Sequence, residues 1–247
     1  MRLFGVIGKP LAHSFSKKYF TEKFEKENLT DCRYENFQLE SIEEFKQLML
    51  ISGLQGLNVT LPYKKKVLLF LDEISAEVEK IGACNCIKIM NGKTKGFNTD
   101  VIGFKKSLEK KIDFTKQQTA LILGTGGAAK AVQFVLEELQ INYQFVSRNP
   151  ANRQLAYKQL NAETMNLNQL IINTTPLGMC PNEKDFPEIP YEHLGSNHLL
   201  FDLIYNPKKT NFLIKGEAKG AEIQNGLEML QIQADESWKI WNNDEEN

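Results

Sequence analysis

The chain has 247 residues, which fits one large α/β domain or two smaller ones. It is 42% hydrophobic and 25% charged, ordinary values for a globular protein, so disorder is not expected. The formal net charge of −1 gives no electrostatic reason to expect nucleic acid or an anionic membrane as a partner. No apolar run approaches the length of a membrane span, and the first ten residues break at glycine and proline too early for a secretory signal.

The four cysteines, Cys32, Cys84, Cys86 and Cys180, contain no CxxC pair, and the three histidines are scattered along the chain. A metal site would need more ligands close together. We therefore expect no metal, and reduced, buried thiols in a cytoplasmic protein.

The first hundred residues alternate between strand-like and helix-like patterns. Strands are predicted at residues 2–8, 33–39 and 56–60, and a hairpin turning at Asn91-Gly92 within residues 84–100. Helices are predicted at residues 16–28, at 41–50 with Ser41 and Glu44 as a capping box, and from Pro62 to about Lys80.

The alternation becomes more regular after a helix at about 101–111 and a polar connector at 113–118. Further helices are predicted at 127–140, 208–219 and 226–241, between strands at 119–124, 143–147, 170–176, 198–205 and 221–223. Nearly continuous apolar strands separated by helices predict a doubly wound parallel sheet. The chain is therefore predicted to be an α/β protein with two domains, residues 1–100 completed by the C-terminal helix 226–247, and residues 101–225.

A glycine-rich loop lies between the strand at 119–124 and the helix that follows it. Gly124-x-Gly126-x-x-Ala129 lets the chain turn sharply and approach a diphosphate, whose charge the amides at a helix N-terminus favour. This pattern indicates dinucleotide binding; the alternative is a tight βα turn without a ligand.

The end of the next strand distinguishes the two nicotinamide cofactors. An NAD site would place Asp or Glu there, whereas this chain has Ser147, Arg148 and Asn149, with Arg153 nearby. An arginine can pair with a 2′-phosphate, so the sequence favours NADP. The arginines could instead be solvated surface charges.

Three consecutive lysines follow Pro62. In the predicted helix, Lys64 shares the inward face of Val67, Leu68 and Leu71, whereas Lys65 and Lys66 face solvent. A lysine in the first turn meets the positive end of the helix dipole, which suits it to proton transfer. Asp100 could be its carboxylate partner or simply the N-cap of the helix predicted from Val101.

These motifs occur in the order typical of one family. "GKPLAHSFS", "NVTLPYK", "GACNC", "GFNTDVIGF", "GTGGAAKA", "SRN", "NTTPLGM", "DLIYNP" and "GLEMLQIQA" together resemble the shikimate dehydrogenases over essentially the whole chain. The sequence departs from the family pattern at Lys17, where proline is usual, at Ser147-Arg148-Asn149, where NRT is usual, and at Cys86, where threonine is common.

The resemblance implies an N-terminal α/β substrate-binding domain and a Rossmann-like NADP-binding domain with the active site in the cleft between them. It implies reversible reduction of 3-dehydroshikimate by NADPH in aromatic amino acid biosynthesis, without a metal. Lys64 and Asp100 would be catalytic, and the substrate would contact Ser14, Ser16, Thr60, Lys64, Asn85, Asp100, Tyr205 and Gln233. NADP would contact Gly124, Thr125, Gly126, Gly127, Ala128, Ser147, Arg148, Asn149, Thr175 and Gly226.

Two other functions remain open on the sequence. One is a paralogue that prefers quinate and uses NAD, because few polar side chains distinguish such substrates. The other is a non-catalytic, nucleotide-sensing relative, although a sensor has no need of Lys64 and Asp100. We expect a small-molecule substrate and a monomer or homodimer.

Overall fold

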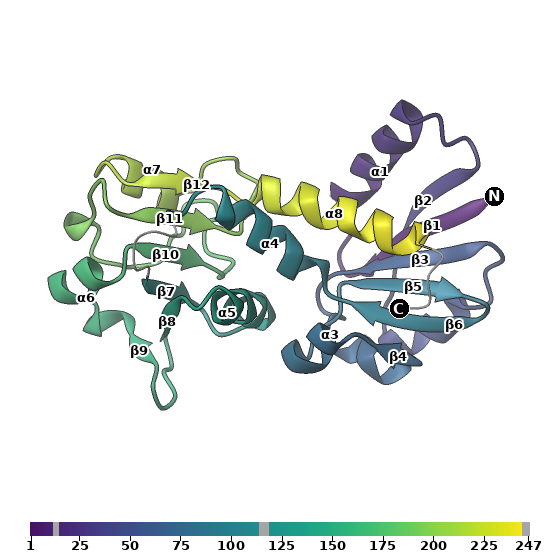
Figure 1. Cartoon of the computed structure of the whole chain (residues 1–247), viewed down its shortest axis with the longest axis horizontal. Coiled ribbons are helices and arrows are strands. Elements are labelled where there is room, and N and C mark those ends of the chain that lie inside the picture. Colours follow the sequence, from purple (N-terminus) through teal and green to yellow (C-terminus); the bar gives the residue numbers. More distant parts are fainter. Residues whose placement is uncertain (12–14, 114–118, 244–247) are drawn as a thin grey trace. The chain divides into compact units, whose positions relative to one another are not determined.

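The computed structural model describes residues 1–11, 15–113 and 119–243. The chain divides into two compact units, which are described separately (Figure 1). Unit 1 comprises Met1–Thr99 and Gln233–Asn247, and unit 2 comprises Asp100–Ile232. In the described ranges, no helix is long and apolar enough to span a membrane.

Unit 1 contains a mixed sheet of order β2-β1-β3-β5-β6-β4. Its strands are β1 (Arg2–Gly8), β2 (Cys32–Gln38), β3 (Leu54–Val59), β4 (Glu73–Ile74), β5 (Cys86–Met90) and β6 (Lys93–Phe97). β1 pairs in parallel with β2 and β3, and the β5–β6 hairpin continues the sheet antiparallel to β3. The predicted α/β character of this half is confirmed.

Two hydrophobic cores flank this sheet. One contains Phe4, Phe20 and Trp241 and joins the sheet to α1 (Phe15–Lys26) and to the end of α8 (Leu227–Asn242). The other contains Phe45, Val67 and residues of η1 (Ile42–Glu44), α2 (Phe45–Leu48), η2 (Lys66–Phe70) and α3 (Ala76–Ile81). Because successive strand residues point to opposite faces, one sheet supports both cores.

The long helix predicted from Pro62 to about Lys80 is wrong. Residues 61–65 form turns, η2 is a short 3₁₀ helix, and only α3, capped by Ser75, is α-helical. Asp72 interrupts the helix, because its carboxylate accepts hydrogen bonds from the Thr94 backbone N–H (2.7 Å) and hydroxyl (2.8 Å). The adjoining β4 then pairs with β6. Tertiary strand pairing has overridden a helical pattern of apolar residues.

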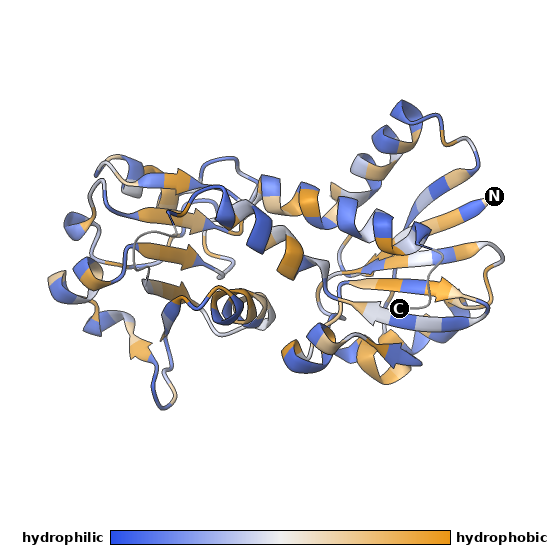
Figure 2. Ribbon diagram, in the orientation of Figure 1, coloured by the Kyte–Doolittle hydropathy of each residue, from blue (hydrophilic) through white to orange (hydrophobic). Residues whose placement is uncertain are grey.

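Unit 2 contains the predicted parallel, doubly wound sheet, of order β12-β11-β10-β7-β8-β9. Its strands are β7 (Thr119–Leu123), β8 (Asn142–Ser147), β9 (Leu155–Ala156), β10 (Leu170–Asn173), β11 (Leu199–Asp202) and β12 (Glu222–Gln224). The helical elements are α4 (Thr99–Glu109), α5 (Gly127–Glu138), η3 (Tyr157–Gln159), α6 (Ala162–Leu167), η4 (Tyr191–His193), α7 (Asn211–Glu217) and the start of α8. Figure 2 shows β10 and β11 as predominantly hydrophobic, as expected for strands covered on both faces.

The strand order of unit 2 reverses beside β7. The chain runs outward from β7 to β8 and β9, and then returns to β10 on the other side of β7. In open α/β sheets, ligands bind beyond the carboxyl ends of the strands at such a reversal. The segments that follow β7 and β10 therefore form the candidate ligand site of this unit.

The division between the units falls inside two helices. Thr99 is the last residue of unit 1 in the first segment and also the first residue of α4. The first part of α8, residues 227–232, belongs to unit 2 by its contacts. The domain boundaries expected from the sequence instead placed the whole C-terminal helix in the first domain.

Close packing between β3 and α8 predicts the effect of Gly56→Ala. A Cβ at Gly56 would lie 2.4 Å from the Trp241 ring, whose Nε1 donates to the Ile87 carbonyl at 3.0 Å. We expect this substitution to lower the free energy of unfolding by about 1–3 kcal/mol. Gly195→Ala is the matched control, because a Cβ there meets nothing within 4 Å. Equal unfolding midpoints in urea for the two variants would contradict this packing.

Candidate functional site

A buried cluster of amides and hydroxyls lies in unit 1 around Asn85, whose side chain is 3% exposed. Its backbone N–H donates to the Phe97 carbonyl (3.0 Å), and its carbonyl accepts from the Val59 N–H (2.8 Å), which fixes it between β3 and β6. Its Oδ1 accepts from the Thr99 N–H at 2.7 Å, and its Nδ2 donates to Gln233 Oε1 at 3.4 Å. The side-chain oxygen of Asn85 therefore accepts its hydrogen bond from within the protein.

Thr99 is a member of this cluster that the sequence reasoning missed. It is 1% exposed, and its hydroxyl lies 3.2 Å from Asn85 Oδ1 and 3.3 Å from Gln233 Oε1. The signal available in the sequence was its position beside Asp100 in "FNTD". Because α4 begins at Thr99, Asp100 lies in the first turn of the helix, and its reading as an N-cap before Val101 is wrong.

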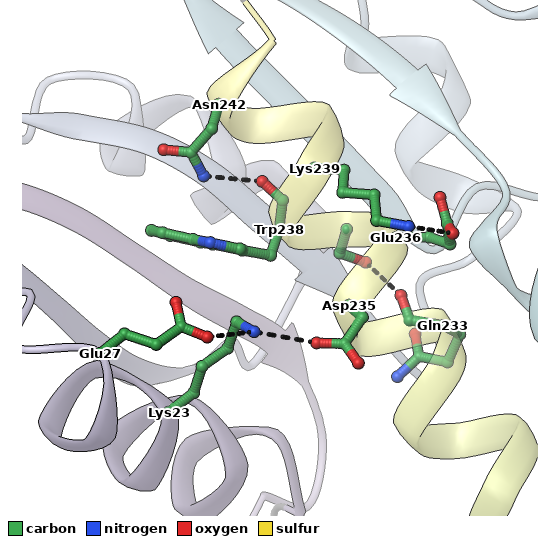
Figure 3. A network of polar contacts seen from close by, with 9 residues as sticks. Lys23, Glu27, Gln233, Asp235, Glu236, Trp238, Lys239 and Asn242 are labelled. Atoms are coloured by element: carbon green, nitrogen blue, oxygen red, sulfur yellow. Dashed lines mark hydrogen bonds and ion pairs between the residues drawn. The ribbon is translucent and has the colours of Figure 1, made fainter.

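The part of α8 that belongs to unit 1 places Gln233 in the cluster. Trp241 stacks on Phe4 with ring centroids 5.0 Å apart, which seats the helix on the sheet. Lys23 of α1 pairs with Asp235 at 3.0 Å and with Glu27 at 2.8 Å (Figure 3). An aromatic contact and a two-carboxylate ion pair therefore fix the helix turn that carries Gln233.

Lys64 lies in the turn after β3. Tyr63 is buried and donates its hydroxyl to the Leu39 carbonyl at 2.7 Å, and the Lys64 carbonyl accepts from the Cys84 N–H at 2.8 Å. Lys64 is half-buried, whereas Lys65 and Lys66 are exposed, as predicted. The helix dipole expected to act on Lys64 is absent, because no α-helix begins here in the described segment 61–65.

The segment before Asn85 joins the Lys64 turn to the start of α4. Cys84 bonds the Lys64 carbonyl through its backbone, and Asn98 Nδ2 donates to the Ala83 carbonyl at 2.9 Å. The structure therefore brings Lys64, Asn85 and Thr99 together within unit 1. Asp100 is the first residue of unit 2, and the expected pairing of Lys64 with Asp100 stays a prediction.

The remaining predicted substrate residues of unit 1 lie on β3 and α1. Thr60 follows β3, and its N–H donates to the Ile7 carbonyl at 2.9 Å. Ser16 is in the first turn of α1 and is half-buried. Lys17, which replaces the usual proline, pairs with Glu35 at 2.7 Å. Ser14 lies outside the described residues.

In unit 2, the glycine loop connects β7 to α5. Gly124 has φ +107°, and a Cβ there would lie 2.8 Å from Thr174 Oγ1, so both its conformation and its neighbour require glycine. Gly126 is the N-cap of α5 and offers no side chain to the first helical amides. A Cβ on Gly126 would meet nothing within 4 Å. This open space beside helical N–H groups fits a diphosphate.

The other residues predicted for this loop have the exposure that a ligand contact requires. Thr125 and Ala128 are exposed and Gly127 is half-buried, whereas Ala129 is fully buried against the sheet. The small Ala129 side chain thus allows the close helix–strand packing predicted from the sequence.

The segment after β10 approaches the same loop. Thr174 donates its hydroxyl to the Leu123 carbonyl at 2.6 Å, directly before Gly124. Thr175 donates its hydroxyl to Asn173 Oδ1 at 2.6 Å. Thr175 and the glycine loop therefore lie at the point where the strand order reverses.

The residues after β8 form an exposed turn. Ser147 accepts from the Asn149 N–H at 3.2 Å through its hydroxyl, and the Arg148 side chain between them is exposed. Burial raises the pKa of Tyr157, and the nearby Arg148 charge opposes that rise. An exposed guanidinium at this position fits a phosphate on the adenosine ribose.

Asp202, at the end of β11, is a second residue that the sequence reasoning missed. It is fully buried and accepts hydrogen bonds from Thr210 Oγ1 (2.5 Å), Asn173 Nδ2 (3.0 Å) and the Ile204 N–H (3.1 Å). Burial raises its pKa to about 6, and these hydrogen bonds oppose the rise. Asp202 thereby ties β10 to the segment that carries Tyr205.

Tyr205 follows Asp202 closely in the chain, and Gly226 packs against the segment between them. Tyr205 is half-buried, and burial raises its pKa. The Gly226 N–H donates to the Ile204 carbonyl at 3.0 Å, and a Cβ on Gly226 would lie 2.1 Å from the Leu203 carbonyl oxygen. Only glycine allows the two backbone segments to approach this closely.

The cysteines match their prediction in part. Cys84 and Cys86 are buried thiols, but Cys32 is half-buried and Cys180 is exposed, so full burial was wrong for these two. Across the described ranges, no group of three or more His, Cys, Asp or Glu side chains is arranged to hold a metal.

Comparison with known proteins gives consistent matches. The family model for the shikimate dehydrogenase substrate binding domain matches residues 6–87. The chain is 36% identical to a Methanococcus maripaludis protein named shikimate dehydrogenase (NADP(+)), with 97% of this chain and 91% of the relative covered.

Two solved structures are similar over nearly the whole chain. One is a chorismate mutase/shikimate 5-dehydrogenase fusion protein from Clostridium acetobutylicum, with a TM-score of 0.87, 36% identity, and coverage of 98% of this chain and 91% of that one. The other is a Thermus thermophilus shikimate 5-dehydrogenase in complex with NADP(H) and shikimate, with a TM-score of 0.86, 31% identity, and coverage of 98% and 94%.

The raised pKa of Asp202 predicts a pH dependence of stability. Between its ordinary value of 3.8 and about 6, the folded chain holds more protons than the unfolded chain, so this group's contribution to stability falls as pH rises. We expect wild type to lose about 2–3 kcal/mol across this interval relative to Asp202→Asn.

Chemical unfolding of the two proteins at both ends of the interval measures this difference. Asp31 and Asp72, whose pKa is lowered, are present in both proteins, so their contribution to the pH dependence of stability cancels in the difference. Asp185→Asn, at an exposed position, is the control. A wild-type minus Asp202→Asn difference that is flat with pH would contradict the assignment.

Proposed function

The chain belongs to the shikimate dehydrogenase family, and from that premise we propose that it is the NADP-dependent enzyme that reversibly reduces 3-dehydroshikimate to shikimate in aromatic amino acid biosynthesis. The observation that best supports this is the Asn85 cluster beside the Lys64 turn in unit 1, in a chain whose unit 2 carries a diphosphate loop.

The polar residues of unit 1 bind the substrate. Because Asn85 Oδ1 accepts from Thr99 inside the protein, the Asn85 amide N–H that is not given to Gln233 donates to a substrate hydroxyl oxygen. Gln233 and Thr60 bind further ring oxygens, and Ser14 and Ser16 bind the carboxylate. Tyr205 completes the predicted set of substrate residues.

Lys64 is the general acid in reduction and the general base in oxidation. In the direction of reduction, its ammonium group donates a hydrogen bond to the C3 carbonyl oxygen and transfers the proton as negative charge develops there. Asp100 accepts a hydrogen bond from a substrate hydroxyl and orients the ring. In the oxidative direction, Lys64 takes the proton back from the C3 hydroxyl.

The cofactor is held by residues of unit 2. NADPH supplies the hydride to C3 when bound. The backbone N–H groups of Thr125, Gly126, Gly127 and Ala128 hold the diphosphate, and the Thr175 and Gly226 segments border it. Gly124 supplies the turn that lets the diphosphate approach, because its own N–H donates to the Val146 carbonyl at 2.9 Å. Arg148, with Ser147 and Asn149, binds the 2′-phosphate that distinguishes NADP from NAD.

The location of the enzyme and its assembly are expectations of the same proposal. A biosynthetic enzyme with reduced thiols and a net charge near zero is expected to work in the cytoplasm, without nucleic acid or membrane partners. A monomer or homodimer stays a prediction.

Replacing Lys64 tests the catalytic proposal. We expect Lys64→Ala to lower kcat for shikimate and NADP⁺ by about 10²–10⁴-fold, because the general acid–base group is lost. Lys65→Ala is the matched control: it removes an exposed neighbour with the same side chain and should leave kcat unchanged. Absorbance of reduced nicotinamide measures both. Equal losses in the two variants would contradict the choice of Lys64, and faster wild-type turnover of quinate would contradict the substrate.

Replacing Arg148 tests the cofactor proposal. We expect Arg148→Ala to raise KM for NADP⁺ by about tenfold and to leave KM for NAD⁺ unchanged, because only NADP carries the 2′-phosphate. Arg153→Ala, at an exposed arginine of the same loop, should change neither constant. If Arg153 rather than Arg148 produced the selective rise, the assignment within the loop would be wrong.

A further inference from the structure

A chain of buried hydrogen bonds runs through unit 1 from β2 to α8. It begins at Tyr34, passes through Asn58 and reaches Ser237. From Ser237 it continues to Thr99, which contacts Asn85. The chain ends at a residue of the proposed substrate site, whereas Tyr34 and Ser237 have no assigned role.

Tyr34 is the first residue of this chain. It is 3% exposed, and its hydroxyl donates to Asn58 Oδ1 at 2.8 Å. Burial raises its pKa well above the usual value, so the group stays a phenol and keeps its proton for Asn58.

Asn58 is the centre of the chain and is satisfied on both sides. Its Oδ1 accepts from Tyr34, and its Nδ2 donates to Ser237 Oγ at 3.0 Å and to the Asn85 carbonyl at 3.3 Å. At 5% exposure, the amide depends on these partners rather than on solvent. The Asn85 backbone is therefore linked to the orientation of the Asn58 amide.

Ser237 connects Asn58 to the other end. It is fully buried on α8, one turn after Gln233, and donates its hydroxyl to the Gln233 carbonyl at 2.9 Å. The same oxygen accepts from Asn58 and lies 3.2 Å from Thr99 Oγ1. One hydroxyl thus contacts β3 through Asn58, the start of α4 through Thr99, and the turn of α8 that carries Gln233.

We propose that Tyr34 and Ser237 are positioning residues of the substrate site, which hold Asn85 and Gln233 in one arrangement through the Asn58 amide. This inference rests on the proposed function and deepens it. Neither residue touches the substrate; each fixes groups that do. A buried amide that loses a partner reorients or draws in water, and a displacement passes to the residues bonded to it.

The first test is Ser237→Ala compared with Ser107→Ala. Ser107 is a fully buried helical serine of α4 that donates to the Gly103 carbonyl at 2.8 Å, as Ser237 does to Gln233. Both variants lose the same bond to the preceding helical turn, but only Ser237→Ala also removes a partner of Asn58 and of Thr99. We expect Ser237→Ala to raise KM for shikimate by about tenfold, with kcat and KM for NADP⁺ changed less than about twofold.

The second test is Tyr34→Phe, alone and combined with Ser237→Ala. Phenylalanine fills the same space and removes only the hydroxyl, so folding should be preserved. We expect a rise in KM for shikimate of about fivefold, again without a rise for NADP⁺. Because both residues act through Asn58, the rise in the double variant should be smaller than the product of the single rises.

The outcomes separate the possibilities. If KM for shikimate in Ser237→Ala and Tyr34→Phe equals that of Ser107→Ala, the chain is merely structural and the positioning proposal is overturned while the function stands. The same holds if the double variant shows the full product, because the residues then act independently. If wild type does not oxidise shikimate with NADP⁺, the proposed function itself fails, and the positioning proposal fails with it.

Discussion

The structure of the substrate-binding half depends on one constraint: amides and hydroxyls removed from water beneath Asn85 must satisfy one another. Asn85 is bonded to Thr99 and Gln233, and its carbonyl accepts from Asn58. These residues come from four places in the sequence. Their hydrogen bonds can form together only when β3, the segment before β5, the start of α4 and the middle of α8 occupy fixed positions in unit 1. The hydrophobic contacts of Trp241 and the Lys23–Asp235 ion pair bring α8 to this arrangement.

A different constraint governs the nucleotide-binding half, where glycines leave room for a neighbouring segment or for a ligand. Gly124 lies against Thr174, and Gly126 leaves open space at the start of α5. These loops follow the two adjacent strands at which the order of the sheet reverses, which leaves a ligand access to the helix amides. The buried Asp202, at the end of β11, is bonded to the end of β10 through Asn173 and to the start of α7 through Thr210. Burial raises the pKa of Asp202, and this carboxyl group has a structural role beside the proposed cofactor residues.

Much of this architecture could be predicted from the sequence, because strand patterns and glycine loops are local. The parallel sheet of unit 2 and the glycine turn into α5 follow from patterns of neighbouring residues. Lys64 is half-buried as expected, although the helical periodicity that predicted this belongs to a helix that does not form. The helix from Pro62 failed for the opposite reason: Asp72 bonds Thr94, which is far along the chain, and that contact is invisible to periodicity. Thr99, Ser237 and Asp202 were missed for the same reason. A single serine or threonine carries no signal until its partners are known.

The central claim is that the Asn85 cluster forms part of the substrate site, and a crystal structure with shikimate bound tests it most directly. We expect substrate oxygens within hydrogen-bond distance of Asn85 Nδ2 and of the Gln233 side chain, with Lys64 at the C3 oxygen. We also expect that Tyr34 and Ser237 do not touch the substrate and keep their bonds to Asn58. Shikimate bound away from Asn85, or a cluster whose hydrogen bonds rearrange on binding, would contradict the claim.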